Sequence, residues 1–251
     1  MRANKREMLL DTHIDCLTMA ETLAEIETII AEKRKVHHVV LNASKVNLLK
    51  RDAKLAAIIN ESALINADGQ SIVWAGRFLG IDVPERVTGI DIFENLIELA
   101  QRKGYKVFYF GAEEETVLKV KAIHLRRYPK LQIVGHHNGF FDEAQSVKIA
   151  EKISRSQADI LFVAFSSPMK EYWVNAHREQ LTVPFVMGVG GSFDIVAGVT
   201  RRAPTWMRRS GLEWVYRFLQ EPKRMFKRYF IGNVSFILNV LQEKWMRKGH
   251  E

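Results

Sequence analysis

The chain has 251 residues, a formal net charge of +8, 47% hydrophobic residues and a single cysteine, Cys16. This size and apolar content fit one sizeable globular domain, alone or with an appendage, and exclude a chain that is disordered throughout. One cysteine excludes a disulfide scaffold and favours a reducing compartment. We expect no signal peptide, because no long apolar run follows the basic residues 1–7. We expect no transmembrane helix either, because the most apolar stretch, 230–241, is short and contains the polar residues Asn233, Ser235 and Asn239.

The positive charge is concentrated at the C-terminal end. Residues 200–251 contain 12 of the 37 basic residues and 4 of the 29 acidic residues. The rest of the chain therefore has 25 residues of each sign. We therefore predict a neutral body, residues 1–200, and a basic, aromatic appendage, residues 201–251, with the boundary near residues 203 and 204. The partner of such an appendage is anionic: a phosphate, a nucleic acid or an acidic membrane face.

Apolar runs alternate with amphipathic stretches along the body. The alternating pattern of residues 9–16 predicts an extra edge strand. Apolar runs then predict strands at 38–41, 63–65, 106–110, 132–134, 160–164 and 184–187. Helical patterns predict helices at 44–60, 90–103, 113–128, 143–156 and 169–180. The strict alternation predicts an α/β fold, in which helices cover both faces of a mostly parallel sheet, followed by a basic helical appendage.

Small and polar residues follow each predicted strand, at the edge of the sheet where such folds bind ligands. Any one of these glycines can simply form a turn, but their joint placement predicts a ligand site. The residues are Asn42, Asn66, Asp68, Gly69, Gly111, Gly139, Ser166, Ser167, Pro168, Gly188, Gly190 and Gly191. The run Gly188-Val189-Gly190-Gly191 can offer backbone N–H groups to a phosphate or ribose, or form a tight turn that serves packing.

Asp68 is the first candidate for chemistry. A carboxylate at this edge can act as a general base, and the alternative is an N-cap for a helix that begins near Gln70. The sequence has no Asp-x-Asp pair to hold a metal. Its eight histidines form no metal-ligand pattern, because the neighbours in the pairs at 37–38 and 136–137 would point to opposite faces of a strand. We therefore expect no metal and no other cofactor.

Cations and aromatic residues interleave in the appendage. Arg217, Arg224, Lys227 and Arg228 recur at spacings of 7, 3 and 1, and the first two spacings place cations on one helical face. The interleaved aromatic residues are Trp206, Trp214, Phe226 and Tyr229. This composition is typical of interfacial membrane helices and of some nucleic-acid-binding surfaces. A solvated basic helix with core-facing aromatic residues is the third interpretation.

Taken in order, the motifs resemble those of the WecG/TagA/CpsF family of bacterial glycosyltransferases over residues 36–229. The motifs that carry the resemblance are Asn66-Ala67-Asp68-Gly69, Arg86-Val87-Thr88-Gly89-x-Asp91, Gly139-Phe140-Phe141, Pro168-x-x-Glu171-x-Trp173, Gly188-Val189-Gly190-Gly191-x-Phe193-Asp194, Ala197-Gly198, Arg202-Ala203-Pro204-x-Trp206-Met207, Gly211-Leu212-Glu213-Trp214-x-Tyr216-Arg217 and Glu221-Pro222-x-Arg224.

The resemblance implies a Rossmann-like body and an appendage that completes the active site at the membrane. It implies inverting transfer of a sugar from a UDP-sugar to a polyprenyl-diphosphate-linked saccharide, without a metal, in the synthesis of teichoic acid or another cell-surface polysaccharide. The expected location is the cytoplasmic face of the cell membrane, on an anionic surface. The donor sugar would be of the N-acetylmannosamine type, a uronic acid or a hexose, and the sequence is compatible with a homo-oligomer.

The resemblance also assigns roles to residues. It implies that Asp68 is the catalytic base. It implies that the departing diphosphate is bound by Arg217, Arg224, Lys227 and Arg228. It implies that the substrates are bound by Asn42, Asn66, Gly69, Arg86, Gly89, Asp91, Gly111, Pro168, Lys170, Glu171, Gly188, Gly190, Gly191, Phe193 and Asp194.

Two positions depart from the family pattern. Val40 stands where the family often has Thr, and Lys170 stands where it often has Gln. The extra charge at Lys170 would suit a donor with a carboxylate, or a changed acceptor. The alternatives to the glycosyltransferase are a non-catalytic protein that binds nucleotide sugars and a nucleic-acid-binding protein that uses the basic appendage.

Overall fold

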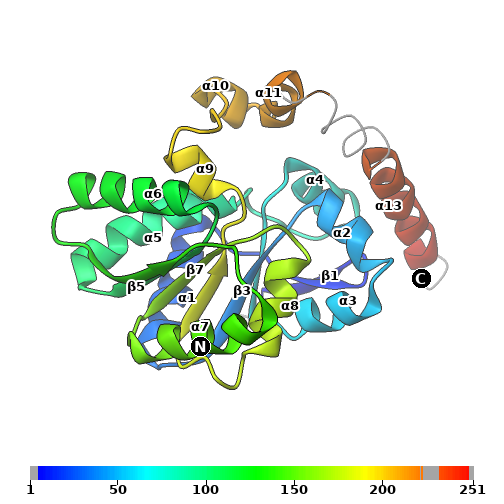
Figure 1. Cartoon of the computed structure of the whole chain (residues 1–251). Coiled ribbons are helices and arrows are strands. Elements are labelled where there is room, and N and C mark those ends of the chain that lie inside the picture. The colour runs from blue at the N-terminus through cyan, green and yellow to red at the C-terminus, as the bar shows by residue number, and fades with distance from the viewer. Residues whose placement is uncertain (1–4, 221, 223–231, 249–251) are drawn as a thin grey trace.

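A computed structural model describes residues 5–220, 222 and 232–248, without the side chains of Arg209, Arg217 and Lys248 (Figure 1). The helices and strands follow one another in the order β1 (Arg6–Leu9), β2 (Thr12–Asp15), α1 (Met19–Ala31), β3 (Val36–Leu41), α2 (Ala43–Leu49), α3 (Ala53–Asn60), β4 (Leu64–Ala67), α4 (Gln70–Phe78), α5 (Gly89–Lys103), β5 (Lys106–Gly111), α6 (Glu114–Arg127), β6 (Gln132–His137), α7 (Glu143–Arg155), β7 (Ile160–Ala164), α8 (Met169–Ala176), β8 (Phe185–Gly188), α9 (Ser192–Val196), α10 (Thr205–Arg209), α11 (Glu213–Gln220) and α13 (Gly232–Lys248).

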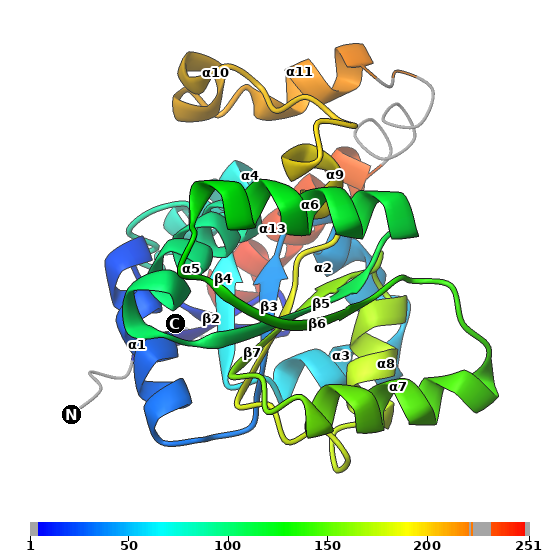
Figure 2. The ribbon, with the colours of Figure 1, turned by 60° about the vertical axis from the view of Figure 1, so that its left-hand side comes forward.

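The centre of the molecule is a six-stranded parallel sheet with the strand order β4-β3-β8-β7-β5-β6. Each of the six strands coincides with a predicted apolar run, so the predicted α/β, Rossmann-like fold is confirmed. The carboxyl ends of all six strands lie at one edge because the strands are parallel. This edge faces α10 and α11, which lie above it in Figures 1 and 2.

Helices cover both faces of the sheet, and successive strand residues supply the two cores. In β5, Val107 and Tyr109 pack with residues of α1, α5 and α6, whereas Phe108 and Phe110 pack with residues of α7 and α8. All four side chains are fully buried. Burial of a large apolar side chain stabilises the fold by roughly 1.5–3 kcal/mol, so a strand that is apolar on both faces is held from both sides.

Two predicted elements differ in the structure. Residues 9–16 do not add an edge strand to the large sheet, because β1 and β2 form a separate antiparallel pair joined by Leu10 and Asp11. The predicted helix over 44–60 is two helices, α2 and α3. Its interruption follows from the side chain of Asp52, which accepts a hydrogen bond from the Leu55 N–H and so begins α3 as an N-cap.

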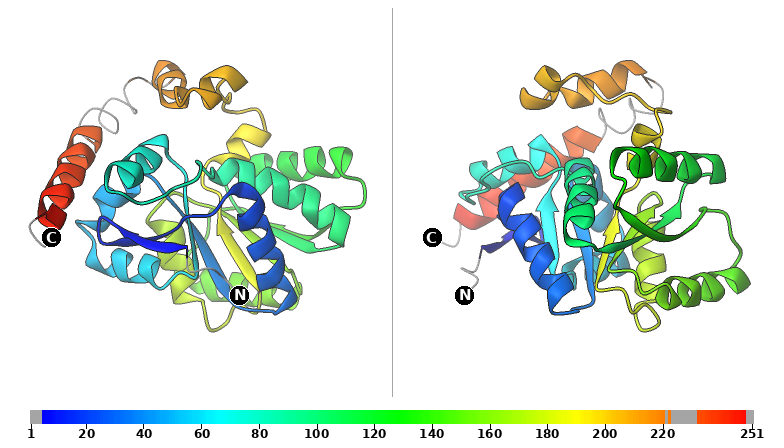
Figure 3. Two further views of the ribbon diagram at one scale, coloured as in Figure 1. Left: turned by 180° about the vertical axis from the view of Figure 1, so that it is seen from behind. Right: turned by 90° about the vertical axis from the view of Figure 1, so that its left-hand side faces the viewer.

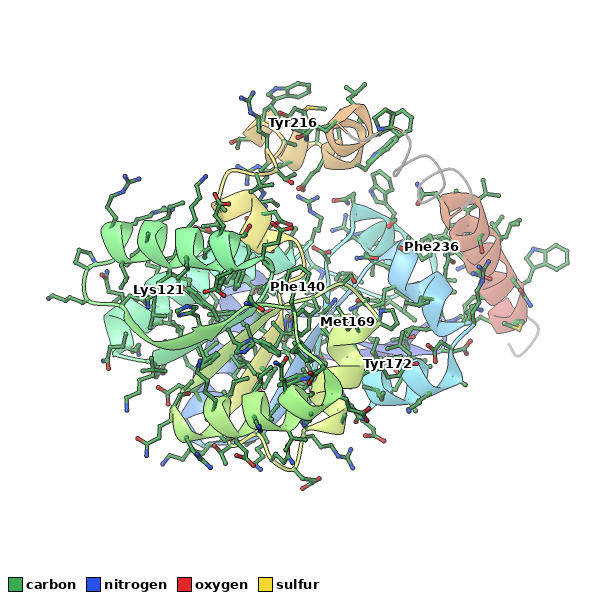
Figure 4. The ribbon with its side chains drawn as sticks, viewed as in Figure 1. Lys121, Phe140, Met169, Tyr172, Tyr216 and Phe236 are labelled. Atoms are coloured by element: carbon green, nitrogen blue, oxygen red, sulfur yellow. The ribbon has the colours of Figure 1, made fainter. Side chains whose placement is uncertain are left out.

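The last described helix, α13, packs on the body (Figure 3). Its Phe236, which is labelled in Figure 4, and its Val240 are buried among residues of α2, α4 and the β1-β2 pair. Asn47 of α2 donates a 2.6 Å hydrogen bond to the Gly232 carbonyl, and Arg247 donates one of 2.7 Å to the Met8 carbonyl. Part of the predicted appendage therefore belongs to the core of the molecule. In the part of the chain that the structure describes, no helix is long and apolar enough to cross a membrane.

Candidate active site

Two clefts meet at Asp68. The first, the sheet-edge cleft, has a volume of about 450 Å³ and is lined by the loops that follow β3, β4, β7 and β8. The second, the appendage cleft, has a volume of about 280 Å³ and lies between α2, α4 and residues 211–214. Both clefts are lined by Asn42, Ser44, Asp68 and Ile90. Asp68 therefore lies where the two clefts adjoin.

Backbone and side-chain hydrogen bonds fix the Asp68 carboxylate. The residue directly follows β4, and its N–H donates a 2.9 Å hydrogen bond to the Leu41 carbonyl. Its Oδ1 accepts from the Gly89 N–H at 3.2 Å and its Oδ2 from Asn42 Nδ2 at 3.4 Å. The N-cap of α4 is Gly69, with no side-chain cap, so the alternative that Asp68 caps this helix is wrong. The half-buried carboxylate is left to face the clefts.

Asn42 and Gly89 owe their positions to the starts of two helices. Asn42 is the N-cap of α2, and its Oδ1 accepts a 3.0 Å hydrogen bond from the Lys45 N–H. This bond orients the amide so that its Nδ2 faces Asp68. Gly89 is the first residue of α5, which Thr88 caps. Two helix starts thus hold the candidate base from two directions, and both flanking residues line the sheet-edge cleft.

The glycine-rich loop after β8 contributes a wall of the sheet-edge cleft. Gly188, Gly190, Gly191, Ser192 and Asp194 all line it. Gly190 has a φ of +53°, a conformation that glycine adopts without the penalty other residues incur. The Ser192 hydroxyl donates a 2.8 Å hydrogen bond to the Val189 carbonyl and closes the turn. The loop is therefore a tight turn and also part of the cleft.

A buried group of three charged side chains lies beneath this cleft. Glu171 Oε1 is 2.8 Å from Lys45 Nζ and 3.3 Å from Lys170 Nζ. Ser167 Oγ donates to Glu171 Oε1 at 2.8 Å and accepts from Lys170 Nζ at 2.6 Å. Burial raises the pKa of Glu171, but the two ammonium groups outweigh it and hold this pKa at about 2. Burial and the neighbouring Lys45 lower the pKa of Lys170 to about 8.

Arg86 and Asp91, two predicted substrate-binding residues, connect the body to the appendage. Arg202 lies 2.7 Å from the Asp91 carboxylate. Arg86 lies 3.4 Å from Glu213 of α11 and donates a 3.1 Å hydrogen bond to the Arg208 carbonyl. Arg86 also lines the appendage cleft, and Asp91 lines neither cleft. These contacts attach the appendage to the body beside the cleft that Asp68, Gly211 and Trp214 line.

Several other predicted site residues lie outside the clefts. Asn66 is fully buried between His38 and Thr22, and Phe193 is fully buried in the core. Gly111 packs closely against the backbone of Ala164, and a Cβ on Gly111 would come within 2.9 Å of that backbone. Pro168 and the buried Glu171 line neither cleft. None of these five residues lines either cleft, and their predicted contacts with substrate stay predictions.

The predicted diphosphate-binding cations are not part of the described site. Arg224, Lys227 and Arg228 lie outside the described residues, and so does the side chain of Arg217 on α11. Among residues 5–220, 222 and 232–248, no three His, Cys, Asp or Glu side chains are grouped so that they could hold a metal ion.

Other residues that line the clefts escape prediction from the sequence. Lys45 pairs with a residue 126 positions away, and no local pattern reports that pairing. Trp74 and Trp214 both line the appendage cleft, and Thr200 and Gln220 reach the sheet-edge cleft. The helical spacing of Gln70 and Trp74 on α4 would have placed both on one face, and this was the available signal.

A Rossmann-like sheet whose carboxyl edge forms a polar cleft beside a glycine-rich loop places the chain among the α/β proteins that bind ligands beyond the carboxyl ends of their strands. The chain matches the Glycosyl transferase WecG/TagA/CpsF family over residues 7–250. It belongs to this family and is a glycosyltransferase, which excludes the alternatives of a sugar-nucleotide sensor and a nucleic-acid-binding protein as its class.

Two relatives from different bacteria carry the same activity in their names. The chain is 30% identical over 219 residues to the N-acetylglucosaminyldiphosphoundecaprenol N-acetyl-beta-D-mannosaminyltransferase of Staphylococcus aureus strain MW2, covering 86% of this chain and 85% of that protein. It is also 30% identical over 207 residues to the Bacillus spizizenii protein of the same name, covering 80% of this chain and 78% of the relative.

Proposed function

We propose that this glycosyltransferase moves a sugar from a UDP-sugar to a saccharide linked to polyprenyl diphosphate, with inversion at the anomeric carbon. The observation that carries the proposal is the position of the Asp68 carboxylate, which faces both clefts. The names of the relatives support the substrate class, an N-acetylglucosaminyl diphosphoundecaprenol acceptor and an N-acetylmannosaminyl group as the transferred sugar. Cell-wall teichoic acid or a related surface polysaccharide is the product class.

The sheet-edge cleft is the proposed donor site. It is the larger cleft, and the loop of Gly188, Gly190 and Gly191 brings backbone close to a ligand without side chains in the way. Asp194 on the same wall supplies a carboxylate that suits ribose hydroxyls. The appendage cleft is the proposed acceptor site, where the indole faces of Trp74 and Trp214 suit a sugar ring and Gln70 and Ser71 suit its hydroxyls.

Asp68 is the proposed general base. Its carboxylate takes the proton of the acceptor hydroxyl while that oxygen attacks C1 of the donor sugar. The bond between C1 and the diphosphate oxygen breaks, and UDP leaves with the electron pair. Attack on the face opposite UDP inverts the anomeric carbon. The hydrogen bonds from Asn42 and Gly89 hold the carboxylate in place between the two substrates.

The charge that develops on the leaving diphosphate is balanced by protein cations, without a metal ion, in our proposal. Arg217, Arg224, Lys227 and Arg228 remain the predicted partners in the appendage. The same segment is the proposed contact with an anionic membrane surface, where the acceptor lipid resides. Its described part exposes Trp206, Trp214 and Trp245, a residue type that is enriched at membrane interfaces.

A panel of UDP-sugars tests the proposal directly. The full chain is incubated with each donor and a polyprenyl-diphosphate-linked N-acetylglucosamine acceptor, and the release of UDP and the anomeric configuration of the product are measured. We expect acceptor-dependent UDP release with an inverted product. UDP release that does not depend on the acceptor, or a retained configuration, would contradict the proposed reaction.

A further inference from the structure

The buried charges beneath the sheet-edge cleft do not balance. Two ammonium groups, those of Lys45 and Lys170, share the single carboxylate of Glu171. The side chains of these three residues are 5%, 10% and 0% exposed, in that order. The group therefore carries one positive charge in excess, largely out of contact with water.

Both lysines line the sheet-edge cleft, and Lys170 is the less tightly paired of the two. Lys45 makes the shorter contact with Glu171, at 2.8 Å, whereas Lys170 lies at 3.3 Å. The Lys170 ammonium donates to Ser167 Oγ, and an ammonium has three N–H donors. A Cβ on Gly188 would come within 2.5 Å of Lys170 Cδ, so the missing side chain of Gly188 lets the lysine stem cross the end of β8. Lys170, Ser167 and Gly188 all line the sheet-edge cleft.

Burial of an incompletely paired ammonium is unfavourable, and the lowered pKa of Lys170 reports this cost. The other titratable groups around it are Lys45 of α2, Glu171 of α8, His37 of β3 and Asp68 after β4. Asp194 of α9 lines the same cleft. The Asp68 carboxylate is held by Asn42 and the Gly89 N–H. An anionic ligand in the cleft would complete the group.

We propose that Lys170 binds an anionic group of the nucleotide-sugar donor and thereby determines donor specificity. This inference rests on the proposed function, because it places the donor in the sheet-edge cleft. Two parts of a donor could supply the anion: a carboxylate on the sugar, as in a uronic acid, or the diphosphate. A uronic-acid donor would make Lys170 a selector among sugars, whereas the diphosphate would make it a general anchor for UDP-sugars.

Calorimetric titration of the full chain distinguishes the two sources. The ligands are uridine, UDP, UDP-N-acetylmannosamine and UDP-N-acetylmannosaminuronic acid. The proteins are the wild type, Lys170→Gln, and Lys148→Gln as a matched control for an exposed lysine on α7. A hydrogen bond to a charged group is worth roughly 10- to 100-fold in affinity. We expect Lys170→Gln to weaken at least one anionic ligand by that factor, and Lys148→Gln to leave all four within about twofold.

The pattern of losses identifies the anion. A loss confined to the uronic-acid donor assigns the sugar carboxylate. An equal loss for UDP and both donors, with uridine unchanged, assigns the diphosphate. The proposal is overturned if Lys170→Gln binds all four ligands as the wild type does, or if uridine loses as much as the others. Thermal unfolding accompanies the titrations, and Lys170→Gln should be at least as stable as the wild type because it leaves Lys45 and Glu171 as a balanced pair.

A second measurement uses the wild type alone and so does not depend on the folding of a variant. The affinity for the anionic ligand should fall roughly tenfold between pH 7 and pH 9, as Lys170 loses its proton near pH 8. The affinity for uridine should stay constant, and a flat profile for the anionic ligand would overturn the inference.

If the wild type binds UDP and transfers sugar while Lys170→Gln binds normally, the inference alone fails. If the wild type binds no UDP compound, the proposed function fails.

Discussion

Substitution of Glu171 by Gln removes the carboxylate on which the buried charge group depends, with little change in shape. In the wild type, Oε1 of Glu171 contacts two lysines and the Ser167 hydroxyl, and the side chain is fully buried. The variant would leave two ammonium groups buried without an anion. Removal of one partner from a buried ion pair costs about 3–5 kcal/mol.

The pKa of Glu171 provides an independent estimate. It is lowered from 4.5 to about 2, and each unit corresponds to about 1.4 kcal/mol, so ionised Glu171 contributes roughly 3 kcal/mol at neutral pH. We therefore expect urea titration at pH 7 to give a free energy of unfolding for Glu171→Gln that is about 3–5 kcal/mol below that of the wild type. Glu179→Gln is the matched control, because the Glu179 side chain is 88% exposed, and it should change stability by under about 0.5 kcal/mol.

The pH dependence has a definite sign. Because the folded pKa lies below the unfolded value, the contribution of Glu171 is complete above pH 4.5 and disappears as the pH falls toward 2. The difference between wild type and Glu171→Gln should shrink over that range. A loss of less than about 1 kcal/mol at pH 7, or a difference that grows in acid, would refute the argument.

Three further outcomes are expected. Transfer should continue in excess EDTA, as measured by UDP release, and a strict requirement for Mn²⁺ or Mg²⁺ would exclude the proposed role of protein cations. The full chain should sediment with anionic liposomes at low salt, and Trp245→Ser should weaken this binding without a loss of stability, because Trp245 is 83% exposed. Phe236→Ala should instead destabilise the fold by about 3–5 kcal/mol in urea titration, because Phe236 is buried between α13 and the body, and a loss near zero would mean that α13 is not docked.

The parallel sheet could be predicted because its strands are buried on both faces. Such strands appear in the sequence as continuous apolar runs, as in the segment that forms β7. The β1-β2 pair was missed because its turn uses Leu10 and Asp11 at positive φ, and neither gives the glycine or asparagine signal of a hairpin. Helix α1 was also missed, although Thr18 and Glu21 form a capping box that the sequence displays.

The candidate site could be predicted where it depends on the ends of strands. Asn42 follows β3, Asp68 follows β4, and Gly188 is the last residue of β8. The parallel topology brings all three to one edge of the sheet. The ion pairs of the site could not be predicted. Lys45 was missed because a lysine in a short polar-faced helix gives no sign of burial in the sequence. The attachment of Arg86 and Asp91 to the appendage depends on contacts between residues more than 100 positions apart in the chain.

In the proposed reaction Asp68 is the general base between donor and acceptor, and the turnover of Asp68→Asn is the decisive measurement. Asparagine retains the size of the side chain but cannot take the proton. UDP release in the presence of acceptor should fall by roughly 10²- to 10⁴-fold, with UDP affinity within about twofold of wild type and the fold intact. Asp82→Asn, at an exposed position, should retain full turnover. Unchanged turnover in a folded Asp68→Asn variant would mean that Asp68 is not the base.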